Sequence, residues 1–401
     1  MKILIVLTYY RPHISGLTIY AERLATAFAR HGHDVTILTS QFEKTLPREE
    51  MVDGVRIIRA PVWFRLSKGV IMPTFGLLAS RLVRQTDVIQ LHLPQFDAAG
   101  ISLRGRILRK PTIITYHCDL LLPPGLFNRL ANLAVSFMNW LTAIFTHRIV
   151  TYTQDYADNS EYLKTKKDKV TIIPPPVELP KSSQEKIDLF RKENNPEDQH
   201  PVIGMAARFA TEKGVEILLD ALPRVLVKYP KAVVQFVGPY KNIIGEEDYF
   251  SRLSPRIADY QKTGNWKFLG SLNPDQMAAF FPNLDVLVLP SLNSTEAFGL
   301  VQIEAMMNGI PCAASALPGV RQPVFRHGMG KIFPIGNSAA LAESIIEIVG
   351  HKENFLTNLT SFGIYEPDNV AREYERLFEN IKMSIRSRMA QTASFWSPAA
   401  R

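Results

Sequence analysis

Along the first half of the chain, short continuous apolar runs alternate with segments whose apolar residues have helical spacing. Short, nearly continuous apolar runs such as Lys2–Thr8 are typical of parallel strands that are covered on both faces. Between such runs, Leu17–Arg30 carries apolar residues at helical spacing, and Gly32 follows it as a stop signal. Further strands are expected at Asp34–Thr39, Val55–Ile58, Val88–His92, Thr112–Tyr116 and Arg148–Tyr152. This alternation predicts a doubly wound α/β domain.

The second half repeats the pattern after a change in composition. The run IIPPPVELP is followed by a polar, charged stretch with few apolar residues, which is typical of a linker. A second series then follows, with strands at Val202–Ala206, Ala232–Val237, Trp266–Leu269, Asp285–Leu289 and Ile310–Ala314 and helices at Val215–Lys228, Pro274–Phe281 and Leu300–Asn308.

We therefore predict an α/β protein of two tandem Rossmann-like domains. The first spans residues 1–180, the linker 181–200 and the second domain 201–365. Residues 366–401 form a C-terminal helix and tail that can cross back to the first domain. Ligands of such sheets bind outside the carboxyl ends of the strands, so a ligand crevice is expected between two facing domains.

The charge of the 401-residue chain is unevenly distributed. Its formal net charge is +8, and residues 1–180 hold 22 Lys and Arg against 14 Asp and Glu, whereas residues 181–401 hold 24 of each. The excess either solubilises the surface or serves an anionic partner, such as a lipid headgroup surface or a phosphorylated substrate. A nucleic-acid partner is not favoured, because no basic-aromatic binding motif is present. Two cysteines, Cys118 and Cys312, fit a reduced compartment.

Neither terminus nor interior indicates a secretory or membrane-spanning protein. The N-terminal MKILIVLTYYRP is typical of a buried first strand and not of a signal peptide. The uncharged stretch Leu130–Thr146 includes several polar residues and is short for a span of about 20 apolar residues. It indicates a soluble or surface-lying helix, with membrane insertion as the alternative.

Several common cofactor and nucleophile motifs are absent from the sequence. No G-x-G-x-x-G opens either domain, and the chain contains no P-loop, G-x-S-x-G or D-x-D motif. A dehydrogenase or a P-loop kinase is therefore not expected. No His/Cys cluster has metal-ligand spacing, so the sequence does not require a metal.

The densest chemical signal is the segment PSLNSTEAFGLVQIE at 290–304. Glu296 lies in the loop after a buried strand, and Glu304 lies in the helix that follows. Between them Phe298, Gly299 and Leu300 form a helix start, whose free N–H groups can bind an anion that Gly299 allows to approach closely. A carboxylate on each side of such a turn suits a sugar nucleotide, one binding sugar hydroxyls and the other ribose hydroxyls. The alternative for Glu296 is an acidic residue that is stabilised only by the helix dipole.

Arg208 and Lys213 form a second signal in the segment GMAARFATEKG. They lie in the loop after the first strand of the second domain, where two cations can converge on one diphosphate. There they would also neutralise a departing nucleoside diphosphate. The alternative is a pair of solvated loop charges.

Histidines form a third signal. His117 follows the strand PTIITYH, and a neutral imidazole at a carboxyl strand end can hydrogen-bond a sugar hydroxyl. The alternative is a loop histidine that is bonded to backbone. His92, at the end of a neighbouring strand, and His13, in the first loop, are weaker candidates.

Almost the whole chain resembles a retaining GT-B-fold glycosyltransferase of family 4, the group 1 glycosyltransferases. The resemblance is carried by the two glutamates, by ARFATEKG, FLGSL and AMMNGIPCAAS, and by RHGHDV at the end of the first helix. It implies that Arg208 and Lys213 bind the donor diphosphate, Glu304 the ribose and Glu296 the transferred sugar. It also implies that His117 lies near the sugar and that Gly270 and Ser271 lie near the base.

The chain departs from the pattern of that family at two positions. The family usually carries two adjacent glycines in the first loop, and this chain has Ser15 and Gly16. Gly16 is retained as a donor-site residue, whereas Ser15 fits only if its φ is ordinary. Gln302 replaces a common proline between the two glutamates, where it should be harmless.

These features predict a metal-independent, retaining transfer of a hexose, such as mannose or glucose, from a nucleoside diphosphate sugar to an acceptor hydroxyl. The donor, GDP-mannose or a UDP-hexose, is a co-substrate, and no cofactor is expected. The alternatives are a sugar-nucleotide 2-epimerase of the same fold and a catalytically inert sugar-nucleotide-binding subunit. Turnover against a panel of donors separates the three.

The basic first domain also predicts where the enzyme acts. Arg104, Arg106, Arg109 and Lys110 precede the strand that ends in His117, and the apolar, aromatic segment Leu121–Trp140 follows it. Such a pairing of cations with an apolar helix suits a peripheral contact with an anionic membrane, although a core helix explains the segment too. We expect a cytoplasmic enzyme that docks on the membrane and glycosylates a lipid or a lipid-linked glycan.

Overall fold

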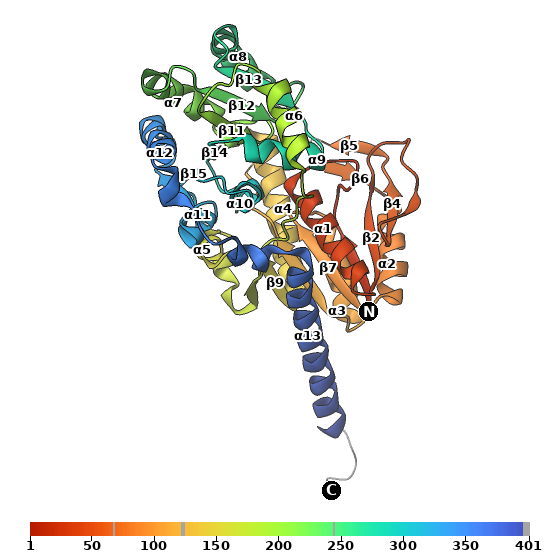
Figure 1. Cartoon of the computed structure of the whole chain (residues 1–401). Coiled ribbons are helices and arrows are strands. Elements are labelled where there is room, and N and C mark those ends of the chain that lie inside the picture. Colours follow the sequence, from red (N-terminus) through yellow and green to blue (C-terminus); the bar gives the residue numbers. More distant parts are fainter. Residues whose placement is uncertain (67–68, 122–124, 244, 396–401) are drawn as a thin grey trace. The chain divides into compact units, whose positions relative to one another are not determined.

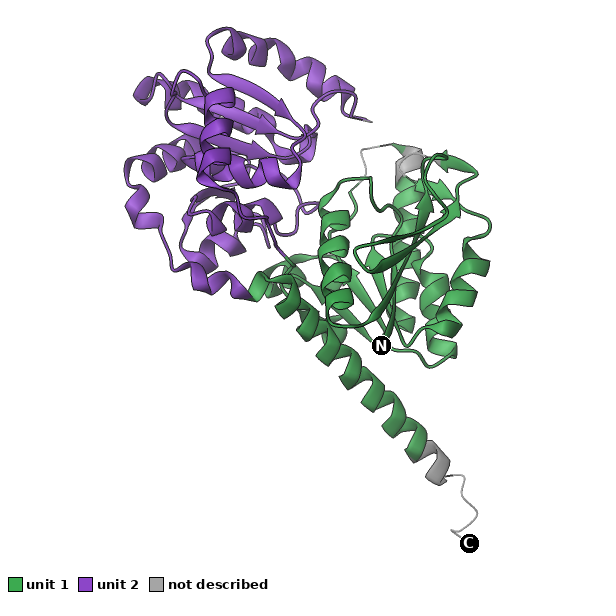
Figure 2. Cartoon of the chain, turned by 45° about the vertical axis from the view of Figure 1, so that its right-hand side comes forward, with its two compact units in different colours: residues 1–176, 364–401 green, residues 177–363 purple. Residues whose placement is uncertain are grey.

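The computed structural model describes residues 1–66, 69–121, 125–243 and 245–395 (Figure 1). The chain forms two compact units (Figure 2). Unit 1 comprises residues 1–176 and 364–401, and unit 2 comprises residues 177–363. The predicted α/β class is confirmed in both units, since each holds a largely or wholly parallel sheet between helices.

Unit 1 is built on a sheet of eight strands within the described residues. Their order is β10-β9-β8-β7-β1-β2-β4-β3, and every neighbouring pair is parallel except β3 and β4. The strands are β1 (Lys2–Val6), β2 (Asp34–Gln41), β3 (Glu49–Val52), β4 (Val55–Pro61), β7 (Val88–Leu93), β8 (Thr112–Tyr116), β9 (Arg148–Thr151) and β10 (Val170–Ile172). A separate hairpin pairs β5 (Phe64–Leu66) with β6 (Gly69–Ile71). The central strands are buried on both faces, as their continuous apolar runs predict.

Helices connect many of these strands along the chain. They are α1 (Gly16–Arg30), α2 (Phe75–Gln85), α3 (Ala98–Ile107), α4 (Leu126–Phe145) and α5 (Gln154–Asn159), with α13 (Pro367–Phe395) added from the far end of the chain. Helix α1 begins at a capping box, in which the Ser15 side chain accepts from Thr18 N and the Thr18 hydroxyl accepts from Ser15 N. Among the described residues, no helix is long and apolar enough to cross a membrane.

The C-terminal helix α13 packs on α1 and completes unit 1. Phe378 is fully buried, with its ring centroid 6.2 Å from that of Phe28. The Tyr374 hydroxyl lies 2.6 Å from the Tyr20 hydroxyl and 3.0 Å from Thr115 Oγ1, which belongs to β8. The return of the chain to its first domain therefore supplies part of the core of that domain.

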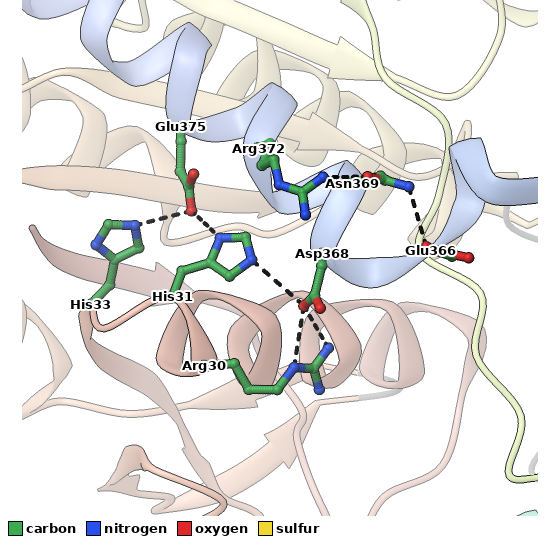
Figure 3. A network of polar contacts seen from close by, with 8 residues as sticks. All are labelled: Arg30, His31, His33, Glu366, Asp368, Asn369, Arg372 and Glu375. Atoms are coloured by element: carbon green, nitrogen blue, oxygen red, sulfur yellow. Dashed lines mark hydrogen bonds and ion pairs between the residues drawn. The ribbon is translucent and has the colours of Figure 1, made fainter.

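The motif RHGHDV holds α13 through a network of polar contacts (Figure 3). Arg30 donates to Asp368 over 2.7 Å, and one Glu375 oxygen lies 2.6 Å from His31 Nδ1 and 3.0 Å from His33 Nε2. The three basic side chains of the α1 end thus face two carboxylates of α13. The structure gives this motif a role in assembling unit 1.

Unit 2 holds a six-stranded parallel sheet within the described residues. The order is β13-β12-β11-β14-β15-β16. The strands are β11 (Val202–Ala206), β12 (Val233–Val237), β13 (Trp266–Gly270), β14 (Val286–Leu289), β15 (Cys312–Ser315) and β16 (Gly330–Phe333). The α-helices are α6 (Gln184–Asn194), α7 (Val215–Lys228), α8 (Glu247–Lys262), α9 (Pro274–Phe280), α10 (Leu300–Met307), α11 (Gln322–His327) and α12 (Ser338–Gly350).

The segment expected as a linker at 181–200 belongs to unit 2. Residues 184–194 form α6, and Arg191 donates to Asn283, whose amide in turn donates to the carbonyl of Ile187. Phe190 is buried and meets Phe280 edge to face. One apolar anchor in an otherwise polar stretch was too weak a signal to predict this helix.

Replacing Phe378 with Ala should strongly destabilise unit 1. The side chain is fully buried against α1, and removing a buried phenyl group costs about 3–5 kcal/mol. Urea unfolding followed by a unit 1 probe measures the loss. Met383, which is exposed on the same helix, supplies the control, because its change to Ala should cost less than about 0.5 kcal/mol. Equal effects of the two substitutions would contradict the packing of α13 described here.

Candidate functional site

The two signal-bearing loops of unit 2 follow neighbouring strands. Strands β11 and β14 are paired, and their loops are joined where Leu292 N donates to the Glu212 carbonyl over 2.9 Å. Gly214 makes this approach possible: its φ is +67°, and a Cβ there would lie 2.2 Å from the Pro290 carbonyl oxygen. The sequence therefore needs a glycine here both for the left-handed backbone and for the contact between loops.

Lys213 and Glu296 meet at this junction. Lys213 Nζ lies 2.6 Å from Glu296 Oε2, and both side chains are more than four-fifths buried. Glu296 is positioned by Asn293, whose carbonyl accepts from Glu296 N and whose side chain accepts from Thr295. Because both groups are largely shielded from water, removing either one would leave the other as an uncompensated buried charge. Two residues that sequence reasoning assigned to one ligand therefore lie in direct contact.

Arg208 is more exposed and pairs with Glu212 of its own loop. Burial alone would raise the pKa of the Glu212 carboxyl, but the Arg208 guanidinium, a backbone hydrogen bond and Lys213 together hold it below its usual value. Glu212 was not identified from the sequence, although its spacing of four from Arg208 was the available signal. The loop thus carries two cations and one carboxylate that stays ionised.

The predicted helix start at Gly299 is present. Gly299 precedes α10 with φ +78°, and an added Cβ would lie 2.3 Å from a methyl group of Leu289. Gln302 is fully buried, and its amide donates to the carbonyls of Phe298 and Val320, so the residue in the usual proline position fixes the turn. The first N–H groups of an α-helix have no partner within the helix and can bind an anion.

Glu304 lies one turn into the same helix and is almost wholly buried. Phe298 and Leu300 flank Gly299 at the helix start, and Phe298 is buried. The structure therefore groups Lys213, Glu296 and the α10 start, with Glu304 on the helix that follows.

Gly270 ends β13, which lies two strands away from β11, and Ser271 follows it. Gly270 has φ +71°, and its carbonyl accepts from Gly238 N over 2.8 Å at the end of β12. Beside them the rings of Phe268 and Tyr240 stack with centroids 4.0 Å apart. These residues share the carboxyl edge of the sheet with the charged loops, because all six strands are parallel.

Unit 1 places His117 in a buried row of rings. Strands β9, β8 and β7 are neighbours, and their carboxyl ends bring Tyr152, His117 and His92 together. His117 Nε2 lies 2.7 Å from His92 Nδ1, while the Tyr152 hydroxyl hydrogen-bonds His117 Nδ1. Both ring nitrogens of His117 are therefore occupied by protein groups, and the residue is only 7% exposed. Tyr152 was not identified from the sequence, though it ends a strand just as His117 does.

Burial makes both histidines neutral. It lowers the pKa of His92 to about 3, and it lowers the pKa of His117 well below the usual value with a further contribution from His92. In the part of the chain that the structure describes, His92 Nε2 has no hydrogen-bond partner. Neutral imidazoles suit the predicted hydrogen bonding to a sugar hydroxyl, but His117 must exchange one of its present partners to make such a bond with its ring.

Gly16 begins α1, and Ser15 precedes it with φ −156°, an ordinary extended conformation. The condition for a serine in place of the first glycine of the resembled family is thus met. His13 stacks on Tyr9, with ring centroids 5.0 Å apart, and is exposed. Within the described residues, no group of three His, Cys, Asp or Glu side chains is arranged to hold a metal ion.

Two family models match consecutive parts of the chain. Residues 14–181 match Glycosyltransferase Family 4, and residues 186–360 match Glycosyl transferases group 1. The first match lies in unit 1 except for its last five residues, and the second lies within unit 2.

Individual relatives and structures agree with these matches. An uncharacterized glycosyltransferase of Methanocaldococcus jannaschii is 26% identical over 94% of this chain and 98% of its own length. A phosphatidyl-myo-inositol mannosyltransferase of Mycolicibacterium smegmatis is 22% identical over 87% of this chain and 85% of its own. Anabaena HepE, solved in complex with UDP-glucose, has a TM-score of 0.68 at 19% identity and covers 98% of this chain and all of its own. The similarity to HepE shows that the two proteins share a fold.

The buried histidines predict a loss of stability in acid. A ring with a pKa near 3 stays neutral in the folded chain, whereas the unfolded chain binds a proton below about pH 6.5. Stability is therefore complete above about pH 6.5 and falls as the pH decreases, by up to about 1.4 kcal/mol per pH unit for each ring.

His92→Gln tests this, because the amide can still bond His117 but does not titrate. Urea unfolding of unit 1 at about pH 7 and about pH 5 should show a smaller pH-dependent loss in the variant than in the wild type. The same loss in both proteins would mean that His92 is not held neutral in the fold.

Proposed function

Because the chain belongs to the group 1 glycosyltransferases of the GT-B fold, we propose that it transfers a hexose from a nucleoside diphosphate sugar to an acceptor hydroxyl with retention of configuration. The observation that carries this proposal is the contact of Lys213 with Glu296 at the start of α10. This contact supports the proposal because a cation and a carboxylate meet on two adjoining loops, one of which leads into the start of α10.

Each donor group has a partner in unit 2. Lys213 binds the diphosphate as a point charge, and Arg208 binds it with a planar fork. The N–H groups at the α10 start hold a phosphate oxygen. Glu296 accepts from hydroxyls of the transferred sugar, and Glu304 accepts from those of the ribose. Gly270 and Ser271 lie near the base, at the same edge of the sheet.

In the proposed transfer, negative charge develops on the departing diphosphate, and this determines what the protein must stabilise. The bond between the anomeric carbon and the leaving phosphate breaks, and the acceptor oxygen forms a bond to that carbon on the same face. The acceptor proton passes to the leaving phosphate, so no enzymic nucleophile is needed. Charge accumulates on the departing diphosphate, and Arg208, Lys213 and the α10 start stabilise it.

Unit 1 supplies the acceptor side and His117. We place His117 beside the sugar, where one ring nitrogen exchanges His92 for a sugar hydroxyl while Tyr152 holds the other. This exchange keeps the neutral ring hydrogen-bonded at both nitrogens. Gly16, at the start of α1, allows a close approach of backbone to the donor phosphate.

The donor proposal names two classes, GDP-mannose and a UDP-hexose. The relative named for mannosyl transfer supports the first, and the UDP-glucose complex of a structural neighbour supports the second. Nucleotide released from a panel of GDP- and UDP-sugars identifies the donor. Conversion of a sugar nucleotide without an acceptor would instead support a 2-epimerase, and binding without any turnover would support an inert subunit.

We propose a lipid or lipid-linked acceptor and peripheral contact of a cytoplasmic enzyme with the membrane. Helix α4 supports this, because its large apolar side chains follow one stripe and are exposed. They are Leu130, Leu133, Phe137, Trp140 and Ile144. Residues 122–124 of the segment expected to contact the membrane lie outside the described residues. Activity on a soluble sugar with none on lipid acceptors would refute this part of the proposal.

Replacing Lys213 or Arg208 with Ala should lower kcat by about 10²–10³, with a smaller effect on donor affinity. The charge that each cation meets is larger in the transition state than in the bound donor. Steady-state kinetics together with donor titration separates the two effects. Lys231→Ala is the control, because this exposed lysine precedes β12 at the opposite edge of the sheet. Near wild-type kcat in both loop variants would contradict the assigned phosphate site.

Glu304→Ala should weaken donor binding more than it lowers kcat. Contacts to ribose hydroxyls are similar in the ground state and in the transition state, so their loss affects both equally. A variant that binds the donor normally but fails to turn it over would place Glu304 elsewhere in the reaction.

Turnover should survive removal of divalent metal by a chelator. The cations that meet the diphosphate are side chains of the chain itself, so transfer does not depend on an added ion. Activity measured before and after chelation, with Mg²⁺ or Mn²⁺ added back, decides this. Activity that disappears and returns only with the metal would contradict a field supplied by Arg208 and Lys213.

A further inference from the structure

A groove lined by several basic side chains lies at the amino-terminal edge of the unit 1 sheet. Its volume is about 950 Å³, and α13 forms one wall. The other wall comes from the end of α3 and the turn after it, from the end of α4 and the start of β9, and from the residues just before β10. Because these strands are parallel, the groove lies at the edge opposite to His117 and Tyr152. It is therefore separate from the reaction site proposed above.

Five cationic side chains line the groove against one carboxylate, Asp168. The cations are Arg106, Arg109, Arg148, Lys169 and Arg388. Within the described part of the chain, no ion pair joins Arg106, Arg109, Arg148 or Lys169 to an acidic side chain. Most cations elsewhere on a protein surface are dispersed among carboxylates, so this concentration of one sign favours an anionic ligand.

The cations are held close together by the fold. Lys169 Nζ donates to the carbonyls of Ala143, Ile144 and Thr146 at the end of α4, which fixes its charge in place and occupies its three N–H groups. His147 lies among them, and burial, aided by the charges of Arg106, Lys169 and Arg388, lowers its pKa to about 4 against the opposing effect of a hydrogen bond with the Thr112 backbone. Its ring is therefore neutral and adds no charge of its own. The guanidinium groups of Arg106, Arg109 and Arg148 can receive an anion, because planar forks suit phosphate oxygens, and Lys169 adds its positive charge beside them.

The groove is also apolar. Ile144, Leu377, Ile381, Ile385 and Met389 line it beside the cations. Ile144 is the last residue of the exposed stripe on α4, so the apolar surface of that helix runs directly into the groove. Phe137 and Trp140 stack on this stripe, and α13 continues past the body of unit 1 (Figure 2). A soluble phosphate would use the cations and leave these apolar groups in water.

We propose that this groove binds the phosphate headgroup of an anionic lipid while the apolar stripe of α4 lies in the membrane interface. The site is a defined pocket, which distinguishes it from the diffuse attraction of a basic surface. This inference deepens the peripheral contact in the proposed function by naming its partner group and its residues. It does not depend on which donor or acceptor the enzyme uses.

Co-sedimentation of the full chain with vesicles tests the site. The vesicles are phosphatidylcholine with or without phosphatidylglycerol, and the variant is Arg106→Ala with Arg109→Ala. Each cation near an anionic surface contributes about 1 kcal/mol, so the pair should account for about a 30-fold loss of affinity for the anionic vesicles. The control is Arg81→Ala with Arg84→Ala, which removes the same charge from the exposed face of α2.

The control variant should lose much less affinity than the groove variant. Equal losses would show a diffuse field and overturn the pocket, and an unchanged groove variant would overturn it as well. Met389→Ser should also weaken vesicle binding, because this exposed apolar side chain lines the groove.

Vesicle co-sedimentation repeated in the presence of inorganic phosphate distinguishes a lipid ligand from a free anion. The protein should stay on anionic vesicles in phosphate as it does in chloride of the same ionic strength. Release by phosphate alone would overturn the lipid assignment in favour of a soluble phosphate ligand. Donor turnover on a water-soluble acceptor should be unchanged in the groove variant, so a failure of docking and a failure of the proposed transfer give different results.

Discussion

The candidate site of unit 2 depends on one ion pair between two loops. Lys213 belongs to the loop after β11 and Glu296 to the loop after β14, and their contact of 2.6 Å joins the cation to the carboxylate before any ligand is considered. In the function that we propose, the donor phosphate competes with Glu296 for the lysine. The backbone is arranged for this meeting, since Gly214 and Gly299 both adopt positive φ where a side chain would collide with the neighbouring segment.

Unit 1 depends on a different constraint, the return of the C-terminal segment to the N-terminal part of the chain. Helix α13 places Tyr374 against Tyr20 and Thr115, close behind the row of rings that holds His117. The same helix forms one wall of the basic groove at the opposite edge of the sheet. One C-terminal element thus supports both the buried histidine row and the surface to which we assign the lipid contact.

The sequence predicted the central elements well because their signals are local. The bounds of β8, β11 and α7 agree with the predicted segments, as expected for buried apolar runs and a strongly amphipathic helix. Strand β3 was missed because a four-residue, half-exposed edge strand has little apolar pattern. Helix α6 was missed because its stability comes from Phe190 and from contacts with distant residues such as Asn283.

The sequence also indicated which residues are candidates for the site, but it did not indicate which of them contact one another. Motif spacing indicated that Lys213 and Glu296 share a ligand, yet nothing local shows that they bind each other, because 83 residues separate them. Likewise the position of His117 was clear, whereas its engagement by His92 and Tyr152 depends on strand order. Strand order brings side chains from distant segments into contact, and a single sequence does not show which of these contacts form.

Nucleotide binding to Glu296→Gln tests the competition at the ion pair most directly. Removing the carboxylate charge frees Lys213, so titration calorimetry should show a nucleoside diphosphate binding more tightly than to the wild type, while sugar transfer falls. The nucleoside alone, which carries no phosphate, should bind both proteins equally. Weaker diphosphate binding by the variant would contradict the account, because Glu296 would then support the phosphate site instead of competing for its lysine.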